Sequence, residues 1–491
     1  MLVSCLVGLI AFGNAKRNDY TKEALGDAIT ELPGLPTNIF NEYSMFSGYI
    51  DVYEPHNRSI FYWFVESLNK PTTDPVAVWT NGGPGSSGLL GMFTEHGPFR
   101  PLQNLTLRVQ PWSWVNVANM IYIECPAGVG FSFSDDTSDY TTDDNKTAID
   151  NYHFIQGWLR KFPNYQSNDF YITSESYGGH YMPTLAQQII LGNAAGGNPQ
   201  INFKGVFDGN PYTNHDENQR GEYETYGGHQ MTSRPVYAQW MSACQDGNSS
   251  SNACSNARSA MRSEVGNNID PYAIDYPTCK ERSRYNQVYM FYEYMYNSGI
   301  DNIKPPGIYG RMYDYFKEHP KEVFYTDKHG IAPGDPKIII TTDGFPYDPC
   351  EENYLTGYLN RADVQKAIHV VPKTWPGTHI HYEGGLPDMT VVWQWIIDNT
   401  PTPLHLTIVS GDDDTVCGLA GTQSWMWNMG WKVSSTNWKV WTDTNEQTGG
   451  YLTKWIDAMN LVTVHSAGHL IPETQPSRSL QTFTRYLSGE F

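Results

Sequence analysis

The sequence predicts an α/β fold with a central, mostly parallel sheet and helices on both faces. Two observations predict it. Short apolar runs typical of buried strands alternate with longer segments of helical periodicity, and several strands end in loops rich in glycine, serine or aspartate. The chain has 491 residues, 40% of them hydrophobic, which suits one large core carrying an insertion. We therefore expect one domain over residues 16–491, with an inserted cap at about 211–342.

The predicted elements follow in chain order. Strands are expected at Ser59–Glu66, Val76–Thr80, Met120–Cys125, Phe170–Thr173, Phe203–Asp208, Leu404–Val409 and Leu461–Val464. Helices are expected at Thr147–Phe162, Gly178–Leu191, Asn360–Val370 and Ser477–Leu487. On the first helix, one side is formed by Ile149, Tyr152, Ile155 and Leu159.

Residues 1–15 have the pattern of a secretory signal peptide. An apolar run from Leu2 to Phe12 precedes small residues up to Ala15, and this run is too short to span a bilayer. We expect cleavage near Ala15 and passage through the secretory pathway. Four Asn-x-Ser/Thr triplets agree with this route and are candidate glycosylation sites: Asn57, Asn104, Asn145 and Asn248.

Cysteine spacing suggests two disulfides in the mature chain. The candidate pairs are Cys244 with Cys254, which share a Ser/Asn-rich segment, and Cys279 with Cys350. Cys125 and Cys417 lie in apolar, strand-like surroundings, where free thiols are expected. The sequence alone leaves this connectivity open.

The formal net charge of −20 argues against nucleic acid or an anionic membrane as a partner. We interpret most of these charges as solvated acidic faces, which suit an acidic compartment. No metal or organic cofactor is implied by the sequence, and a homodimer stays an open option.

The loop after the fourth predicted strand carries a candidate nucleophile. In the octapeptide SESYGGHY, Ser176 stands between small residues where a strand turns into a helix. Such a turn exposes the hydroxyl at the end of the sheet, with the free amides of the helix N-terminus behind it. This is typical of a nucleophile elbow, although Ser174 replaces the first glycine of the usual Gly-x-Ser-x-Gly. An ordinary strand-to-helix turn fits the octapeptide equally well, so the partner residues decide.

Two later loops can supply those partners. A nucleophilic serine needs a general base, and the base needs a carboxylate that fixes its tautomer. In the α/β-hydrolase fold, serine, acid and histidine follow in this order, each beyond the carboxyl end of a strand. Ser176, one aspartate of Asp412–Asp414 and His469 satisfy this order. His180 is expected to pack one helical turn after the serine, and His465 is a weaker candidate for the base.

With these motifs in place, the sequence resembles the serine carboxypeptidases from about Leu32 to the C-terminus. The family's blocks appear as SGYIDVYE from Ser47, YWFVES from Tyr62, WTNGGPGSS from Trp79, TEHGPF from Thr94, YIECPAGVGFSFS from Tyr122, SESYGGHY from Ser174, YLNRADVQKAIHV from Tyr358, SGDDDTVC from Ser410 and SAGHLIP from Ser466. The resemblance implies an α/β-hydrolase fold and an acid-active enzyme that removes residues from peptide or protein C-termini through an acyl-enzyme. It selects Asp414 as the acid and His469 as the base.

The resemblance also implies roles for the glycine-rich and acidic motifs. The amides of Gly83 and Tyr177 match the family's oxyanion hole. The group that binds the terminal carboxylate of the substrate matches Asn81, the Gly82 amide, Glu95 and Glu175. Like-charged neighbours raise a carboxyl pKa, and a protonated carboxyl can donate a hydrogen bond, so this site should work best in acid. Without the resemblance, Glu95 reads as a surface charge on a helix and Glu175 as an exposed elbow residue.

Two residues depart from the family pattern. Ser174 opens the elbow in place of glycine, so the backbone strain or the helix packing can differ there. Ser86 stands where the family usually has a cysteine, so the disulfide from this loop to the region of Cys350 cannot form. Cys350 must therefore be free or paired elsewhere.

Two other functions stay open at this stage. One is an acyltransferase or esterase on the same fold, which would cleave small esters but no peptides. The other is a protective protein that stabilises a partner enzyme, which a Ser176→Ala protein with full biological effect would favour. The lysosome, the vacuole and the extracellular space are all compatible destinations.

Overall fold

The structure is a computed structural model, and it describes residues 20–244, 251–279, 339–340, 346–400 and 402–491. The predicted signal peptide and the sequon at Asn248 lie outside these residues. Among the described helices, none combines the length and the apolar character that a membrane crossing requires.

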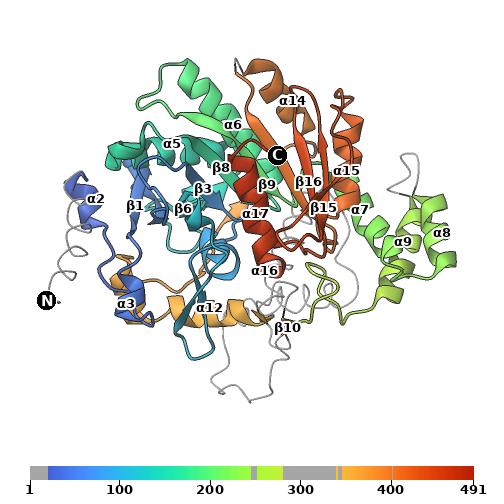
Figure 1. The fold of residues 1–491 in the computed structure, drawn as a ribbon, viewed down its shortest axis with the longest axis horizontal. Helices are drawn as coiled ribbons and strands as arrows, with labels where there is room; N and C mark the ends of the chain where they lie inside the picture. Colours follow the sequence, from blue (N-terminus) through green and yellow to red (C-terminus); the bar gives the residue numbers. More distant parts are fainter. Residues whose placement is uncertain (1–19, 245–250, 280–338, 341–345, 401) are drawn as a thin grey trace, which may run out of the picture.

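A ten-stranded mixed sheet forms the centre of the molecule (Figure 1). Its order is β1-β2-β6-β3-β8-β9-β13-β16-β15-β14. The strands are β1 (Met45–Tyr53), β2 (Arg58–Val65), β3 (Val76–Thr80), β6 (Asn119–Ile123), β8 (Phe170–Glu175), β9 (Phe203–Gly209), β13 (His405–Gly411), β14 (Lys439–Thr442), β15 (Thr448–Lys454) and β16 (Asn460–Val464). The strands from β6 to β16 in this order run parallel, whereas the pairs at both edges are antiparallel. The predicted α/β class is confirmed.

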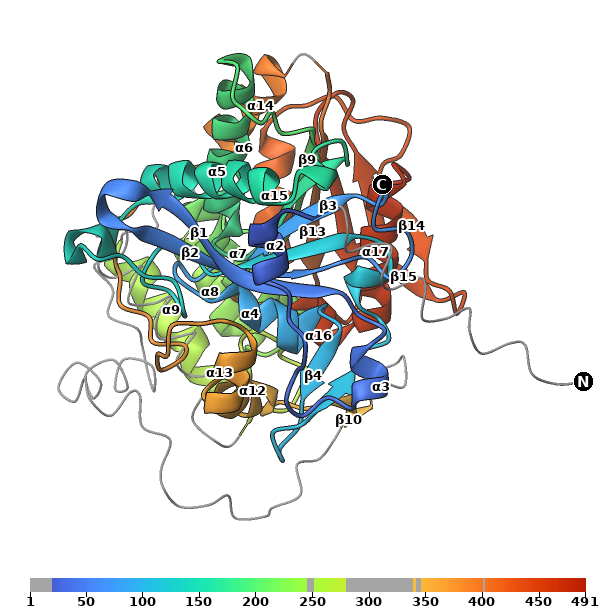
Figure 2. The ribbon, with the colours of Figure 1, turned by 90° about the vertical axis from the view of Figure 1, so that its left-hand side faces the viewer.

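Helices cover both faces of this sheet (Figures 1 and 2). One core contains side chains of α5 (Asp144–Lys161), α6 (Gly178–Ala194), α14 (Thr390–Asn399) and α15 (Leu419–Asn428). The other contains side chains of α4 (Gly88–Leu90), α12 (Glu351–Leu359), α13 (Ala362–Ala367) and α17 (Pro476–Leu487). Strand β3 serves both cores because successive side chains point to opposite faces: Val76 and Val78 belong to the first and Ala77 and Trp79 to the second. Burial on both faces is what a parallel sheet between two helical layers requires.

The region predicted as a cap contains three described helices at the periphery of the molecule (Figure 1). These are α7 (His215–Gly228), α8 (Arg234–Ala243) and α9 (Asn252–Val265). They share a small core that includes Tyr223, Trp240 and Met261. The boundaries at about 211–342 stay a prediction, because most of residues 280–345 lie outside the described part of the chain.

The remaining elements are short. They are α2 (Lys22–Gly26), α3 (Thr37–Phe40), α16 (Ile471–Thr474), β4 (Phe99–Pro101), β5 (Leu107–Val109), β7 (Thr141–Thr142), β10 (Ile339–Ile340), β11 (Pro346–Tyr347), β12 (His381–Tyr382), the 3₁₀ turns η2 (Glu54–His56), η4 (Trp114–Asn116), η5 (Thr137–Tyr140) and η6 (Pro163–Tyr165), and the π-helical turn η3 (Gly91–Glu95).

Three local predictions need correction. Ile155 and Leu159 are buried as predicted, but Ile149 is 42% exposed, because Ala148 takes the buried position beside them on α5. Helix α6 continues through Gly192 to Ala194, since one glycine costs a helix only about 1 kcal/mol. The helix predicted at Asn360–Val370 is shorter in the structure, where it is α13. His369 has a left-handed φ of 60°, which is incompatible with a continuing α-helix.

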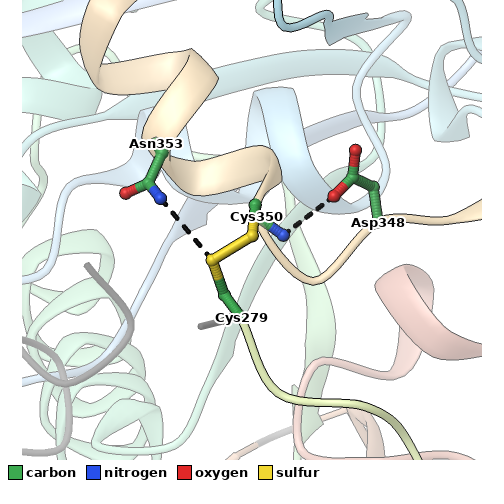
Figure 3. Close-up of a disulfide and its surroundings, with 4 residues drawn as sticks. All are labelled: Cys279, Asp348, Cys350 and Asn353. Atoms are coloured by element: carbon green, nitrogen blue, oxygen red, sulfur yellow. Dashed lines mark hydrogen bonds between the residues drawn. A yellow bond between two sulfur atoms is a disulfide. The ribbon is translucent and has the colours of Figure 1, made fainter. Parts of the chain in front are cut away.

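Both predicted disulfides are present. Cys244–Cys254 joins the C-terminal end of α8 to the first turn of α9. Cys279–Cys350 joins the segment after α9 to the start of α12 (Figure 3). Cys350 is therefore paired with Cys279, whereas the family pattern would pair it with a cysteine at the position of Ser86. Cys125 and Cys417 are free and buried, as predicted.

Candidate active site

The candidate site residues follow four strands that end at the same edge of the sheet. Strands β3, β8, β13 and β16 belong to the parallel part, so their carboxyl ends point the same way. Asn81 follows β3, Ser176 follows β8, Asp412–Asp414 follow β13, and the loop after β16 carries His469. Ligands of open α/β sheets bind at this edge.

Ser176 occupies a sharp turn between β8 and α6. Its φ is 60°, a left-handed conformation that costs a non-glycine residue on the order of 1–3 kcal/mol. The Ser176 amide donates to the Gly209 carbonyl at 3.0 Å, and its carbonyl accepts from the Tyr212 amide at 2.7 Å. Ser174 fits in place of the usual glycine because its hydroxyl donates to the Thr80 carbonyl of the neighbouring strand at 2.6 Å. This geometry is that of a nucleophile elbow.

Asp414 is buried and faces His469. The two side chains approach at 2.7 Å between Asp414 Oδ2 and His469 Nδ1. The main-chain amides of Val416 and Cys417 donate to Oδ1 and Oδ2 at 2.7 and 3.1 Å. The carboxylate is therefore fixed in the orientation in which it holds the imidazole.

Asn210 is a site residue that the sequence analysis did not identify. It follows β9, and its Nδ2 donates to Asp414 Oδ2 at 2.8 Å while its Oδ1 accepts from the Gly411 amide at 3.2 Å. It thus positions the acid loop from the neighbouring strand. An amide side chain directly after a predicted parallel strand was the available signal.

His469 is buried between the acid loop and the cap region. Its amide donates to the Tyr272 carbonyl at 2.6 Å, and the two rings meet edge to face at 4.9 Å. Its Nε2 has no hydrogen-bond partner among the described residues, and no hydrogen bond in that part of the chain joins it to Ser176 Oγ. Such bonds are often long in the absence of substrate. His469 and Glu175, the neighbour of Ser176, line one small cavity.

The other two histidines lie in different surroundings. His465 is exposed, and its Nδ1 lies 2.6 Å from Asp412 Oδ2, so it pairs with a different aspartate. His180 is buried, lies 3.0 Å from Asp144 Oδ2 and stacks on Tyr177, as expected for a packing residue.

The glycine-rich loop after β3 lies directly against the elbow. A Cβ atom at Gly82 would be 2.3 Å from the Tyr177 amide nitrogen and 2.8 Å from Ser176 Cβ, so only glycine allows this approach. Gly83 has a φ of 113°, which also favours glycine. The Gly85 amide donates to Tyr181 Oη at 3.1 Å. Helix α6 therefore holds the loop although the family's disulfide cannot form there.

Asn81, Glu95 and Glu175 form a buried cluster beside this loop. Asn81 Nδ2 donates to Glu95 Oε1 at 2.9 Å and to Glu175 Oε1 at 2.7 Å. Asn81 Oδ1 accepts from Trp79 Nε1 at 2.8 Å and the Gly91 amide at 3.0 Å, which fixes the amide orientation. Glu95 is 0% exposed and Glu175 is 5% exposed. The alternative placements of both glutamates on the surface are therefore wrong.

The two glutamates are electrostatically unusual. Burial raises the pKa of Glu95 to about 8, against the lowering effect of the Asn81 hydrogen bond and the Arg100 charge. Burial and the neighbouring Glu95 raise the pKa of Glu175 well above its ordinary value. Glu473 adds a further raising effect on both. In acid, this cluster presents protonated carboxyl groups and an amide, which can donate hydrogen bonds to an anion.

Arg100 and Glu473 were also missed by the sequence analysis. Arg100 donates to the Glu95 carbonyl at 2.7 Å and to Glu351 Oε2 at 2.5 Å, so its charge is shared between the cluster and α12. Glu473 lies on α16, only four positions after His469. Neither residue stands in a motif that points to a site.

Comparison with known proteins places the chain in a family. The serine carboxypeptidase family matches residues 33–489. Serine carboxypeptidase-like 20 of Arabidopsis thaliana is 31% identical, with 94% of this chain and 93% of the relative covered. Serine carboxypeptidase-like 22 of the same plant is 33% identical, with 96% and 94% covered.

The fold likeness extends to a solved structure. The crystal structure of Kex1(delta)p, a prohormone-processing carboxypeptidase from Saccharomyces cerevisiae, matches with a TM-score of 0.68 at 16% identity. The match covers 95% of this chain and 96% of that chain, and it confirms the predicted α/β-hydrolase fold. Sequence and fold agree over nearly the whole length, and the chain belongs to the serine carboxypeptidase family of hydrolases.

Proposed function

We propose that this chain is a serine-type carboxypeptidase that releases C-terminal amino acids from peptides and proteins at acidic pH through an acyl-enzyme. The observation that carries this proposal is the buried cluster of Asn81, Glu95 and Glu175 beside the elbow. An exopeptidase must bind the free carboxylate at the end of its substrate, and an esterase has no such requirement. Protonated carboxyl groups beside a nucleophile meet this requirement.

The proposed reaction begins with the attack of Ser176 Oγ on the scissile carbonyl carbon, while His469 Nε2 accepts the hydroxyl proton. Asp414 holds the imidazole and stabilises its cation. The amides of Gly83 and Tyr177 would bind the oxyanion, and the loss of one such donor typically costs on the order of 3 kcal/mol. His469 then protonates the leaving amino group, and the C-terminal amino acid departs. Water attacks the acyl-enzyme by the same steps and restores Ser176.

Carboxylate recognition gives the proposed activity its dependence on acid. The Gly82 amide and the protonated Glu95 and Glu175 would donate to the terminal carboxylate, and Asn81 would join them by turning one N–H away from a glutamate. When the glutamates ionise, they repel the carboxylate that they would otherwise bind. The enzyme should therefore prefer free-acid substrates in acid and lose this preference as the pH rises.

We also propose that the protein enters the secretory pathway. Two disulfides fit an oxidising compartment. The sequon residues Asn57, Asn104 and Asn145 are exposed, as glycosylation requires. A chain that enters the secretory pathway and works in a lysosome, a vacuole or outside the cell accounts for these features and for acid activity.

The experiment that tests this function follows the release of the terminal amino acid from N-blocked dipeptides between about pH 4 and 8. C-terminally amidated dipeptides and the Ser176→Ala protein serve as controls. Release in acid from the free acids, much weaker on the amides and lost in Ser176→Ala, is the expected result. Folded, fully processed protein that transfers acyl groups from small esters but releases no amino acid would contradict the proposal and favour an acyltransferase.

A further inference from the structure

Asp413 lies next to the proposed triad acid but has no part in the proposed reaction. Two side chains from other segments approach it: His229, directly after α7, and Asp275, in the segment after α9. One donor atom from each of the three residues lies within 4.8 Å of the other two. His229, Asp275 and Asp413 are far apart in the sequence, so no sequence motif predicts that they lie together.

The Asp413 carboxyl group is buried and incompletely bonded. The residue is 1% exposed, and Oδ2 accepts from the Asp275 amide at 3.1 Å. Oδ1 is buried without a hydrogen-bond partner among the described residues. A buried polar oxygen without a hydrogen-bond partner is costly, and a bound cation would give it a partner.

The neighbouring aspartates do not share this situation. Asp412 pairs with His465 and Asp414 pairs with His469. No ion pair between residues of the described ranges includes Asp413 or Asp275. Among the described residues, the group therefore brings together two carboxyl groups and one imidazole without a lysine or arginine ion pair to either carboxyl group.

We propose that His229, Asp275 and Asp413 bind a divalent transition-metal ion of the Zn²⁺ type. One imidazole nitrogen with two carboxylates suits Zn²⁺, whereas Ca²⁺ and Mg²⁺ prefer oxygen ligands alone. His229 and Asp275 are exposed, so the ion has a path from solvent and water can complete its coordination. Bonds of about 2.0–2.1 Å bring ligand atoms to roughly 3.4 Å from one another. Small shifts of the two exposed side chains, which leave the His229 ring against the acid loop, would supply that approach.

The contacts around the site give the ion a structural effect. His229 Nε2 lies 3.0 Å from the Asp412 carbonyl, which holds the ring against the acid loop. The Asp413 amide donates to the Ala467 carbonyl at 2.9 Å, and the Asp413 carbonyl accepts from the Ile274 amide at 3.2 Å. The ion would thus tie α7 and the segment of Asp275 to the loop that carries Asp414. Bound Zn²⁺ should raise the unfolding temperature.

The test is calorimetric titration of Zn²⁺ into chelator-treated, full-length protein near pH 7, with thermal unfolding measured in parallel. The test variants are His229→Gln and Asp413→Asn. Matched controls are His153→Gln on α5 and Asp216→Asn on α7, two exposed residues outside the group. We expect one Zn²⁺ per chain in the wild type and in both controls, with binding weakened at least about tenfold in both test variants. The Zn²⁺-dependent rise in unfolding temperature should disappear with it.

Three results would overturn the proposal: unchanged Zn²⁺ binding in His229→Gln, equal weakening in the controls, or tighter binding of Ca²⁺ than of Zn²⁺. His229 is exposed, so its replacement leaves the core intact and the test decisive even if Asp413→Asn does not fold. The measurement does not depend on peptidase activity.

Discussion

Two groups of buried carboxyl side chains flank the nucleophile elbow, and they are built in opposite ways. Asp414 receives N–H donors on both oxygens, from His469, Asn210 and two main-chain amides. Glu95 and Glu175 share the single amide of Asn81, burial raises the pKa of both, and the neighbouring Glu95 raises that of Glu175 further. Burial makes charge costly in both places, and hydrogen-bond donors offset part of that cost.

This difference assigns opposite tasks to chemically similar groups. A carboxylate surrounded by donors can stabilise a histidine cation. Carboxyl groups that stay protonated can instead donate to a substrate carboxylate. Replacing Asp414 tests the first group, titrating or replacing Glu95 tests the second, and replacing Tyr181 tests the loop that lies between them and the elbow.

The largest effect is expected from Asp414→Asn. The amide keeps the size of the side chain but cannot hold the correct tautomer of His469, so kcat should fall about 10⁴-fold. Asp412→Asn is the matched control, because Asp412 lies on the same loop and pairs with His465. Steady-state kinetics on one N-blocked dipeptide measures both. Equal losses of kcat in the two variants would contradict the prediction, because they would show that Asp414 is no more important for activity than the exposed Asp412.

A smaller effect concerns the preference for a free terminal carboxylate. The ratio of kcat/KM for dipeptide acid over dipeptide amide should fall about 10- to 100-fold as the pH rises through about 8, because Glu95 then ionises. Glu95→Gln cannot ionise at this position, so it should keep more of the ratio at high pH. If the wild-type ratio stays constant up to pH 9, the two glutamates do not bind the terminal carboxylate, and the prediction is contradicted.

Stability should depend on pH through the same residue. The folded-state pKa of Glu95 is about 8, above an unfolded value of about 4.3. Its contribution to stability is therefore fully present below about pH 4 and is lost as the pH rises through about 8. Glu95→Gln should flatten the fall in unfolding temperature between pH 5 and 8, whereas Glu383→Gln, at an exposed position, should not. Parallel curves for all three proteins would exclude this contribution.

The smallest change in activity is expected from Tyr181→Phe. It leaves the buried Gly85 amide without its acceptor, which should cost about 1–3 kcal/mol of stability. The loop that carries Gly83 would loosen, and kcat should fall less than tenfold. Tyr358→Phe is the matched control, because its hydroxyl donates to the Pro33 carbonyl away from the loop. A larger kcat loss in the control would show that the two contacts have been ranked wrongly.

The sequence predicted the strands of the parallel sheet well because each is a short apolar run bounded by turn residues. Val76–Thr80 is predicted with the same bounds that β3 has in the structure. The antiparallel edges β1, β14 and β15 were not predicted, since their polar and glycine-interrupted sequences lack a clear apolar run. Helix α12 was missed for a related reason, because Gly357 and two tyrosines weaken its helical pattern.

For the site, sequence patterns identified the residues that lie in motifs and missed those that act from outside them. The order of Ser176, Asp414 and His469 is readable because it follows strand ends. Asn210 and Glu473 owe their roles to neighbours that only the folded chain brings close. The burial of Glu95 is likewise a property of the packed sheet, and its sequence position alone fits an exposed helix as well.

The most direct test of the central claim is the protonation state of the buried glutamate pair itself. Infrared difference spectra of wild type against Glu95→Gln, recorded between pH 5 and 9, report the carbonyl band of a protonated carboxyl group. We predict that this band is present at pH 5 and disappears as the pH passes about 8. A pair that is already fully ionised at pH 5 would contradict the account, because two carboxylates could not then bind the terminal carboxylate of a peptide.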